Sequence, residues 1–216
     1  MTITPREIAA YPQDTDYVPY LAVSILVIGL MVGGLLQSGT AAAREWERET
    51  AKELLLSPAS RGAIVLGKML GAFLLSLVPM LVVLAVLVLG LGVIPAHWGE
   101  MFGFSLLTLA IFIALGTLLG TLIKQRGAVT ALSLGLALPL FFVSGPFGPL
   151  SFGTKATQLI ASVLPVSYAI VVQQRAFHNF QLNTFSLGVN TLILAGYALA
   201  FLALATIVLR RSAVTH

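Results

Sequence analysis

Five long apolar segments without a cluster of charged side chains constrain this sequence more than any other feature. A bilayer core about 30 Å thick needs about 20 mostly apolar residues in a helix. Only 9% of the 216 residues are charged, whereas about 25% are charged in a typical water-soluble domain. We therefore predict an all-α membrane protein. Its five transmembrane helices are expected at about 17–37, 62–94, 101–123, 128–147 and 186–209.

The distribution of lysine and arginine predicts how these helices are oriented, because cytoplasmic loops carry an excess of positive charge. With five spans, nine cations fall on one side of the membrane and three on the other, whereas a sixth span at 156–172 would change this to seven and five. The larger asymmetry favours five spans. The N-terminal tail (1–16) is then external, and the C-terminal tail (212–216) is cytoplasmic. The nine cytoplasmic cations would be Arg44, Arg48, Lys52, Arg61, Lys68, Lys124, Arg126, Arg210 and Arg211.

The segment at about 150–180 is apolar enough to be mistaken for a further span. Pro165 lies inside it, and four glycines and prolines crowd the residues just before it, at 145–149. These residues interrupt helices and favour turns. We therefore expect outer helices that form a short, broken hairpin on the external face.

Charged side chains are nearly absent from membrane depth. Between residues 17 and 209, every Asp, Glu, Arg and Lys falls in a loop or near the end of a span. Charged groups inside a bilayer usually mark ion or proton pathways, so a carrier coupled to an ion gradient is disfavoured. The spans also lack cysteine and any candidate catalytic set, which disfavours an enzyme and leaves no candidate cofactor or metal site in this chain.

Three pairs of glycines have the spacing that lets helix backbones approach closely in membranes. They are Gly29 with Gly33, Gly67 with Gly71, and Gly116 with Gly120. We interpret them first as packing contacts within one subunit, ahead of a specific contact between two copies.

The segment 43–58 holds seven of the 20 charges in one short loop. If it is helical, its acidic and basic residues form two adjacent stripes, and Trp46 and Leu54 share a third, less charged face. Pro58 ends the pattern, because the residue before a proline is pushed out of the helical region. We predict an amphipathic cytoplasmic helix at 43–56.

The order of residues in this segment is specific: Arg44, Glu45, Glu47, Thr50, Leu54, Leu55, Ser57 and Pro58, followed by Leu66-Gly67-Lys68. It resembles the segment after the second membrane helix of ABC-2 type permeases, the membrane subunits of a family of ATP-binding cassette exporters. Two positions differ, since Glu49 stands where the family prefers glycine and Lys52 where it often has an acid. The resemblance covers about Tyr17 to Arg211 and implies a permease transmembrane domain over 17–211.

That resemblance implies a coupling helix that lies in a cleft of a separate ATP-binding cassette subunit, where ATP and Mg would be bound. It also implies a second permease copy, in a homodimer or heterodimer. Family members usually have six spans, and in one subgroup an external domain separates the first two. This sequence is therefore expected to lack the first helix and domain, which another chain could supply. The contact residues would be Arg44, Glu45, Glu47, Arg48, Thr50, Leu54, Leu55, Ser57 and Pro58.

The ATPase is expected in another chain because the one phosphate-loop look-alike, residues 62–69, ends in Met69 instead of a hydroxyl residue and has no preceding strand. We therefore predict the permease subunit of an exporter for hydrophobic or amphipathic cargo, such as a drug, a lipid or a lipid-linked glycan, in a bacterial or archaeal cell membrane. Membrane lipid is an expected partner and nucleic acid is not. The alternative is a non-catalytic membrane adaptor that docks a cytosolic protein through 43–58.

Overall fold

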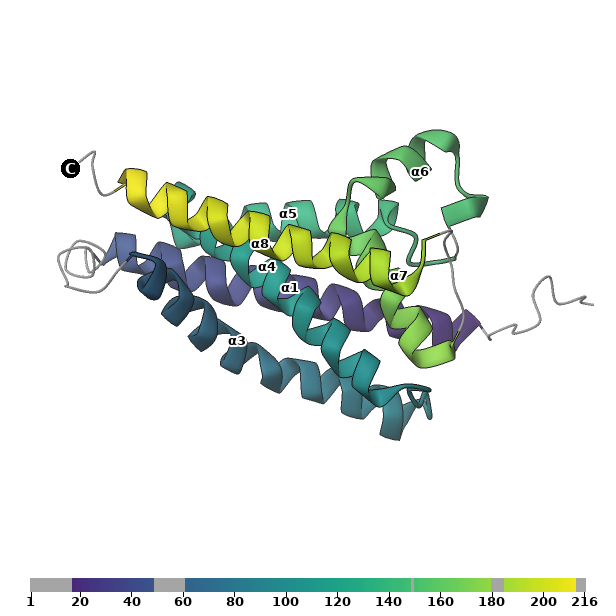
Figure 1. Ribbon diagram of the computed structural model, residues 1–216. Helices are drawn as coiled ribbons and strands as arrows, with labels where there is room; N and C mark the ends of the chain where they lie inside the picture. Colours follow the sequence, from purple (N-terminus) through teal and green to yellow (C-terminus); the bar gives the residue numbers. More distant parts are fainter. Residues whose placement is uncertain (1–16, 49–60, 149, 180–184, 213–216) are drawn as a thin grey trace, which may run out of the picture.

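The computed structural model describes residues 17–48, 61–148, 150–179 and 185–212, and this part of the chain contains helices and turns without a strand. The long helices lie side by side in a bundle (Figure 1). In chain order the elements are α1 (Tyr17–Glu47), α3 (Arg61–Ala85) with the π-helical turn η1 (Val86–Gly90), α4 (Trp98–Ile123), α5 (Arg126–Val143), the 3-10 turn η2 (Leu150–Phe152), α6 (Lys155–Ser162), α7 (Pro165–His178) and α8 (Leu187–Ser212).

Five of these helices are long and apolar enough to cross a membrane, which confirms the predicted number of candidate spans. Their bounds differ in places from the prediction. The first helix continues ten residues past Gln37, to Glu47, and the fourth ends at Val143 instead of 147. The last helix continues to Ser212, the first residue of the predicted C-terminal tail. The tail segments 1–16 and 213–216 lie outside the described residues.

The bundle has two chemically different ends. At one, which we call the loop end, the last turn of α1 meets the start of α5. At the other, which we call the hairpin end, α4 and α8 begin and the pair α6–α7 lies against the bundle (Figure 1). The predicted broken pair is present, and its two helices are bent by 90°. Because α5 ends and α8 begins at the hairpin end, the chain leaves the bundle for the α6–α7 pair and re-enters it at the same end (Figure 1).

Local sequence explains the shape of the α6–α7 pair. Thr154 caps α6, and its side chain accepts a hydrogen bond from the Thr157 backbone N–H at 3.3 Å. Pro165 begins α7 at a position where its missing N–H costs nothing. Asn179 caps the C-terminus of α7, and its φ of 58° is the left-handed conformation common at helix C-termini.

The centre of the bundle is the contact between α1 and α4, the most extensive helix pair in the structure. It is close because glycines face it. A methyl group on Gly120 would collide with the carbonyl oxygen of Gly39 on α1, and one on Gly116 would collide with Ser38. Within a bilayer, helices associate through such close packing, since lipid tails remove the usual hydrophobic advantage.

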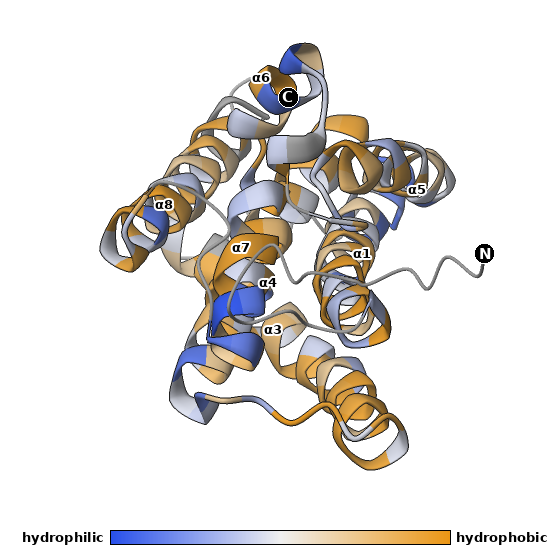
Figure 2. Cartoon of the chain, turned by 90° about the vertical axis from the view of Figure 1, so that its right-hand side faces the viewer, coloured by the Kyte–Doolittle hydropathy of each residue, from blue (hydrophilic) through white to orange (hydrophobic). Residues whose placement is uncertain are grey.

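The three predicted glycine pairs therefore have different environments. Gly116 and Gly120 do pack within the chain, as predicted. Among the described residues, a methyl group built on Gly33, Gly67 or Gly71 would meet no neighbouring atom within 4 Å, so this part of the chain does not use these three glycines for close packing. Large apolar side chains also lie exposed along α3, among them Leu70 and Leu81. Figure 2 shows that hydrophobic residues predominate in the long helices, as expected for helices that cross a bilayer.

We expect Gly120→Ala to lower the free energy of unfolding by about 1–3 kcal/mol, the usual cost of overpacking a tight contact. The matched control is Gly135→Ala, because Gly135 lies inside α5 and a methyl group there would meet no neighbouring atom of the described residues within 4 Å. Thermal unfolding of both variants in lipid nanodiscs measures the difference. Equal midpoints for the two variants would contradict the proposed role of the α1–α4 contact.

Candidate functional site

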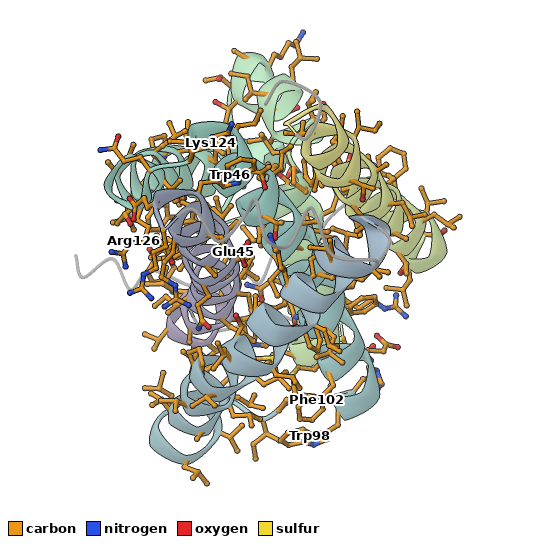
Figure 3. The ribbon with its side chains drawn as sticks, turned by 90° about the vertical axis from the view of Figure 1, so that its left-hand side faces the viewer. Glu45, Trp46, Trp98, Phe102, Lys124 and Arg126 are labelled. Atoms are coloured by element: carbon orange, nitrogen blue, oxygen red, sulfur yellow. The ribbon has the colours of Figure 1, made fainter. Side chains whose placement is uncertain are left out.

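The last turn of α1 directs three consecutive side chains toward three other parts of the bundle. Successive residues of an α-helix point about 100° apart, so neighbours in sequence can reach different helices. Figure 3 shows this end of the molecule with its labelled side chains. We define the loop-end cluster as Glu45, Trp46, Glu47, Lys68, Lys124 and Arg126.

Glu47 joins α1 to the start of α5. Its Oε1 accepts a hydrogen bond from the Arg126 backbone N–H at 2.7 Å, and its Oε2 accepts one from Arg126 Nε at 2.7 Å. Arg126 is the first residue of α5, where backbone N–H groups lack partners within the helix and the helix dipole is positive. A carboxylate at this place therefore satisfies both the backbone and the side chain. The pair is exposed to solvent, so it sets the geometry of the two helices more than their stability.

Trp46 joins α1 to the short turn between α4 and α5. The ammonium group of Lys124 lies 4.1 Å from the centre of the Trp46 ring, a cation–π contact. Lys124 has φ of 59° and closes α4, because its N–H donates to Gly120 O at 3.0 Å. Trp46 also packs in a small apolar cluster with Ala205 of α8. The tryptophan thus connects three helices at one point.

Glu45 joins α1 to the start of α3 through an ion pair with Lys68. Both side chains are more shielded than the Glu47 pair, with 23% and 18% of their surfaces exposed. Lower exposure weakens screening by water and salt. The ion pair holds the two helices on either side of the segment 49–60 together at the loop end.

The predicted contact residues separate into three groups. Glu45 and Glu47 belong to the loop-end cluster, and Arg44 and Arg48 are exposed beside it. The first residues of the predicted helix at 43–56 are continuous with α1, so no break separates them from the span. The other predicted contact residues lie outside the described part of the chain: Thr50, Leu54, Leu55, Ser57 and Pro58.

Sequence reasoning assigned Lys124 and Arg126 only to the count of cytoplasmic cations and missed them as partners of α1. They are about 80 positions away from Trp46 and Glu47 in sequence, so no local spacing joins them. The available signal was the pair of cations in the turn between two predicted spans, on the same predicted side of the membrane as the glutamates of the segment 43–58.

A second polar cluster was also missed. Gln173 and Gln174 of α7 are fully buried. The Gln174 amide donates to Tyr20 O at 2.8 Å and to Ser24 Oγ at 3.3 Å, both on α1. The Gln173 amide donates to Ser105 Oγ of α4 at 2.8 Å. These bonds attach the α6–α7 pair to the bundle core, and two adjacent glutamines in an apolar stretch were the sequence signal.

The buried polar side chains in the described part of the chain are serine, threonine, glutamine and asparagine, and none of them is charged. Within the same residues, no three His, Asp or Glu side chains gather as a metal site would require. The charges lie at the two ends of the bundle. At the hairpin end, Arg175 Nε lies 3.5 Å from Glu100 Oε2.

Comparison with known proteins agrees with this arrangement. Residues 1–207 match the family described as ABC-2 family transporter protein. Two curated relatives, each named "Probable multidrug ABC transporter permease YbhS", come from Escherichia coli strain K12 and Escherichia coli O157:H7. Each is 27% identical over 185 residues, which cover 84% of this chain and 48% of the relative.

The chain therefore spans about half the length of the curated relatives that it matches. The family match covers nearly all of the sequence, and five helices of the structure are suited to crossing a membrane. Together, these observations show that the chain belongs to the ABC-2 family of transporter proteins and is a multi-pass membrane protein.

Proposed function

We propose that this chain is the transmembrane subunit of an exporter that moves a hydrophobic or amphipathic compound outward. The cargo would be a drug, a lipid or a lipid-linked glycan, and the membrane would be the inner membrane of a bacterium or archaeon. Permeases of this family are non-catalytic transport components. ATP and Mg would be bound by a separate ATP-binding cassette subunit, and a second permease copy would complete the transporter. The name of the relatives, a multidrug permease, supports the drug class.

The loop-end cluster is the observation that carries this proposal. It joins the end of α1 to α3 through Lys68, to α5 through Arg126 and to the α4–α5 turn through Lys124. A partner that moves the segment 43–58 would therefore move several helices together. As 31 residues at about 1.5 Å each, α1 is about 46 Å long, so it is long enough to extend beyond a bilayer core of about 30 Å.

The absence of buried charge among the described residues supports the choice of energy source and cargo. A carrier driven by an ion gradient would place a charged side chain on its pathway, and the buried polar groups here are neutral. An uncharged interior suits cargo that has little charge to desolvate. Work would then enter from the cytoplasmic side, through the permease domain (17–211) and its coupling helix.

The proposed docking surface places Arg44 and Arg48 toward the ATP-binding subunit, because both side chains are exposed. Glu45 and Glu47 would act mainly inside the permease, by holding α3 and α5 to α1. Thr50, Leu54, Leu55, Ser57 and Pro58 complete the proposed contact. An adaptor that docks another cytosolic protein would use the same surface, so the experiments below separate the two functions.

Orientation can be tested directly because the chain has no cysteine. We expect Thr154→Cys, at the hairpin end, to react with a membrane-impermeant maleimide in intact cells. Arg44→Cys, at the loop end, should react only after permeabilisation. Both positions are exposed in the structure, so access to the side chain does not limit the comparison. Labelling of Arg44→Cys in intact cells would reverse the proposed orientation.

A charge swap separates the internal role of Glu47 from a docking role. We expect Glu47→Arg and Arg126→Glu each to lower the ATP hydrolysis of the reconstituted transporter several-fold, because each leaves two like charges facing each other. The double variant should recover most of the activity. The swap also suits both helix ends, since arginine is favoured at a helix C-terminus and glutamate at an N-terminus. Lys155→Glu, at the hairpin end, is the control.

Recovery in the double variant would show that the two side chains act as a pair within the permease. If the double variant stays as inactive as Glu47→Arg, Glu47 instead contacts the partner, and the internal role assigned to it is wrong.

The ATPase partner is tested by co-purification. We expect an ATP-binding cassette subunit to co-purify with the intact chain and to be lost with Leu54→Asp, because an apolar contact would be replaced by a charge. Leu159→Asp is the matched control, since Leu159 is exposed at the hairpin end. Association with an ATPase that is equally strong in both variants would reject the proposed docking segment, and association with a protein other than an ATPase would favour the adaptor.

A further inference from the structure

A cavity of about 120 Å³ lies at the hairpin end, between the start of α1, the end of α5 and the α6–α7 pair. It is formed by residues far apart in sequence, so it exists only when the α6–α7 pair is attached to the bundle. Its walls include Tyr20, Ser144, Leu150, Ser167, Tyr168 and Phe185. It lies at the opposite end of the bundle from the loop-end cluster.

Ser167 is the member of this wall that points to a ligand. Ser167 is among the residues that line the cavity and is only 4% exposed, and its Oγ has almost no exposed surface and no hydrogen-bond partner in the described part of the chain. Buried polar atoms almost always have a partner, because burying one without a hydrogen bond is costly. Because no hydrogen bond to a described residue holds this hydroxyl, rotation about the Cα–Cβ bond can turn it toward a bound molecule without breaking one.

The other described hydroxyls on the wall already donate to backbone carbonyls. Tyr20 donates to Gly145 O at 3.1 Å, and Tyr168 donates to Ser162 O at 2.7 Å. Ser144 donates to Leu140 O at 2.6 Å, within α5. These bonds fix the shape of the wall and leave Ser167 as its free buried hydroxyl.

The remaining chemistry of the cavity selects an uncharged ligand. None of the lining residues is charged, and its apolar members include Leu150, Ile170, Val171 and Phe185. The volume is close to the about 150 Å³ of an engineered apolar cavity that holds benzene. A single ring with one hydrogen-bonding substituent fits both the volume and the lining.

We propose that this cavity is a binding site for a small, neutral, amphipathic molecule of the phenol type. The polar group of the ligand bonds to Ser167, and its ring lies among the apolar side chains. The ligand contacts both the bundle and the α6–α7 pair, so its binding stabilises the attached position of that pair. The site is independent of the proposed ATPase partner and of the transported cargo.

The test uses the purified full-length chain in lipid nanodiscs and two probes, 4-fluorophenol and 4-fluorotoluene, followed by ¹⁹F NMR. The two probes have similar size and differ in the hydroxyl group. We expect saturable binding of both. Ser167→Ala should weaken the binding of 4-fluorophenol about three- to tenfold, the range for one hydrogen bond. It should leave the affinity for 4-fluorotoluene unchanged, because alanine adds no atoms to the cavity.

Ser133→Ala is the matched control. Ser133 is also a buried serine whose Oγ has no partner among the described residues, but it lies in the middle of α5 and does not line the cavity. The Ser133→Ala variant should bind both probes as tightly as the unmodified chain does. The proposal is overturned if neither probe saturates, which would mean simple partition into lipid or a cavity that holds only water. It is also overturned if Ser167→Ala weakens both probes equally or matches Ser133→Ala.

Discussion

The close contact between α1 and α4 is the interaction on which the arrangement of the bundle depends. Gly39, Gly116 and Gly120 let the two backbones approach more closely than any larger residue would allow. In lipid, this packing supplies what the hydrophobic effect supplies in water. Because α4 holds α1 at this point, the last turn of α1 lies where Glu45 reaches α3 and Glu47 reaches α5. The loop-end cluster is thus a consequence of a backbone contact deep in the bundle.

The two ends of the bundle use different polar chemistry. At the loop end, ion pairs and a cation–π contact join helix ends that water can reach. At the hairpin end, hydrogen bonds between neutral groups join the helices alongside the ion pair of Arg175 with Glu100. The N–H groups of Ala96 and His97 donate to carbonyls at the end of α7, and Gln174 donates to α1. An irregular segment needs such bonds near a bilayer, because lipid offers no replacement for water.

Much of the fold followed from the sequence, and the candidate site followed only in part. The five apolar helices and the interruption before Pro165 were read from local composition. The end of the first helix was not, because residues 38–47 contain good helix formers and continue the helix past the apolar segment. The family resemblance identified Glu45, Glu47 and Lys68, but it could not show that Lys68 and Arg126 are their partners. Those pairs depend on the angles between helices.

The sequence by itself determined the class of protein, since the length of the apolar segments and the scarcity of charge admit only membrane-spanning helices. It also determined the family, through the order of residues after the first span. Only the tertiary structure decided which glycine pair packs inside the chain, which cations meet the end of α1 and which serine lines a cavity. These contacts join residues distant along the chain. They arise when helices cross, and spacing along one helix does not specify where another will cross it.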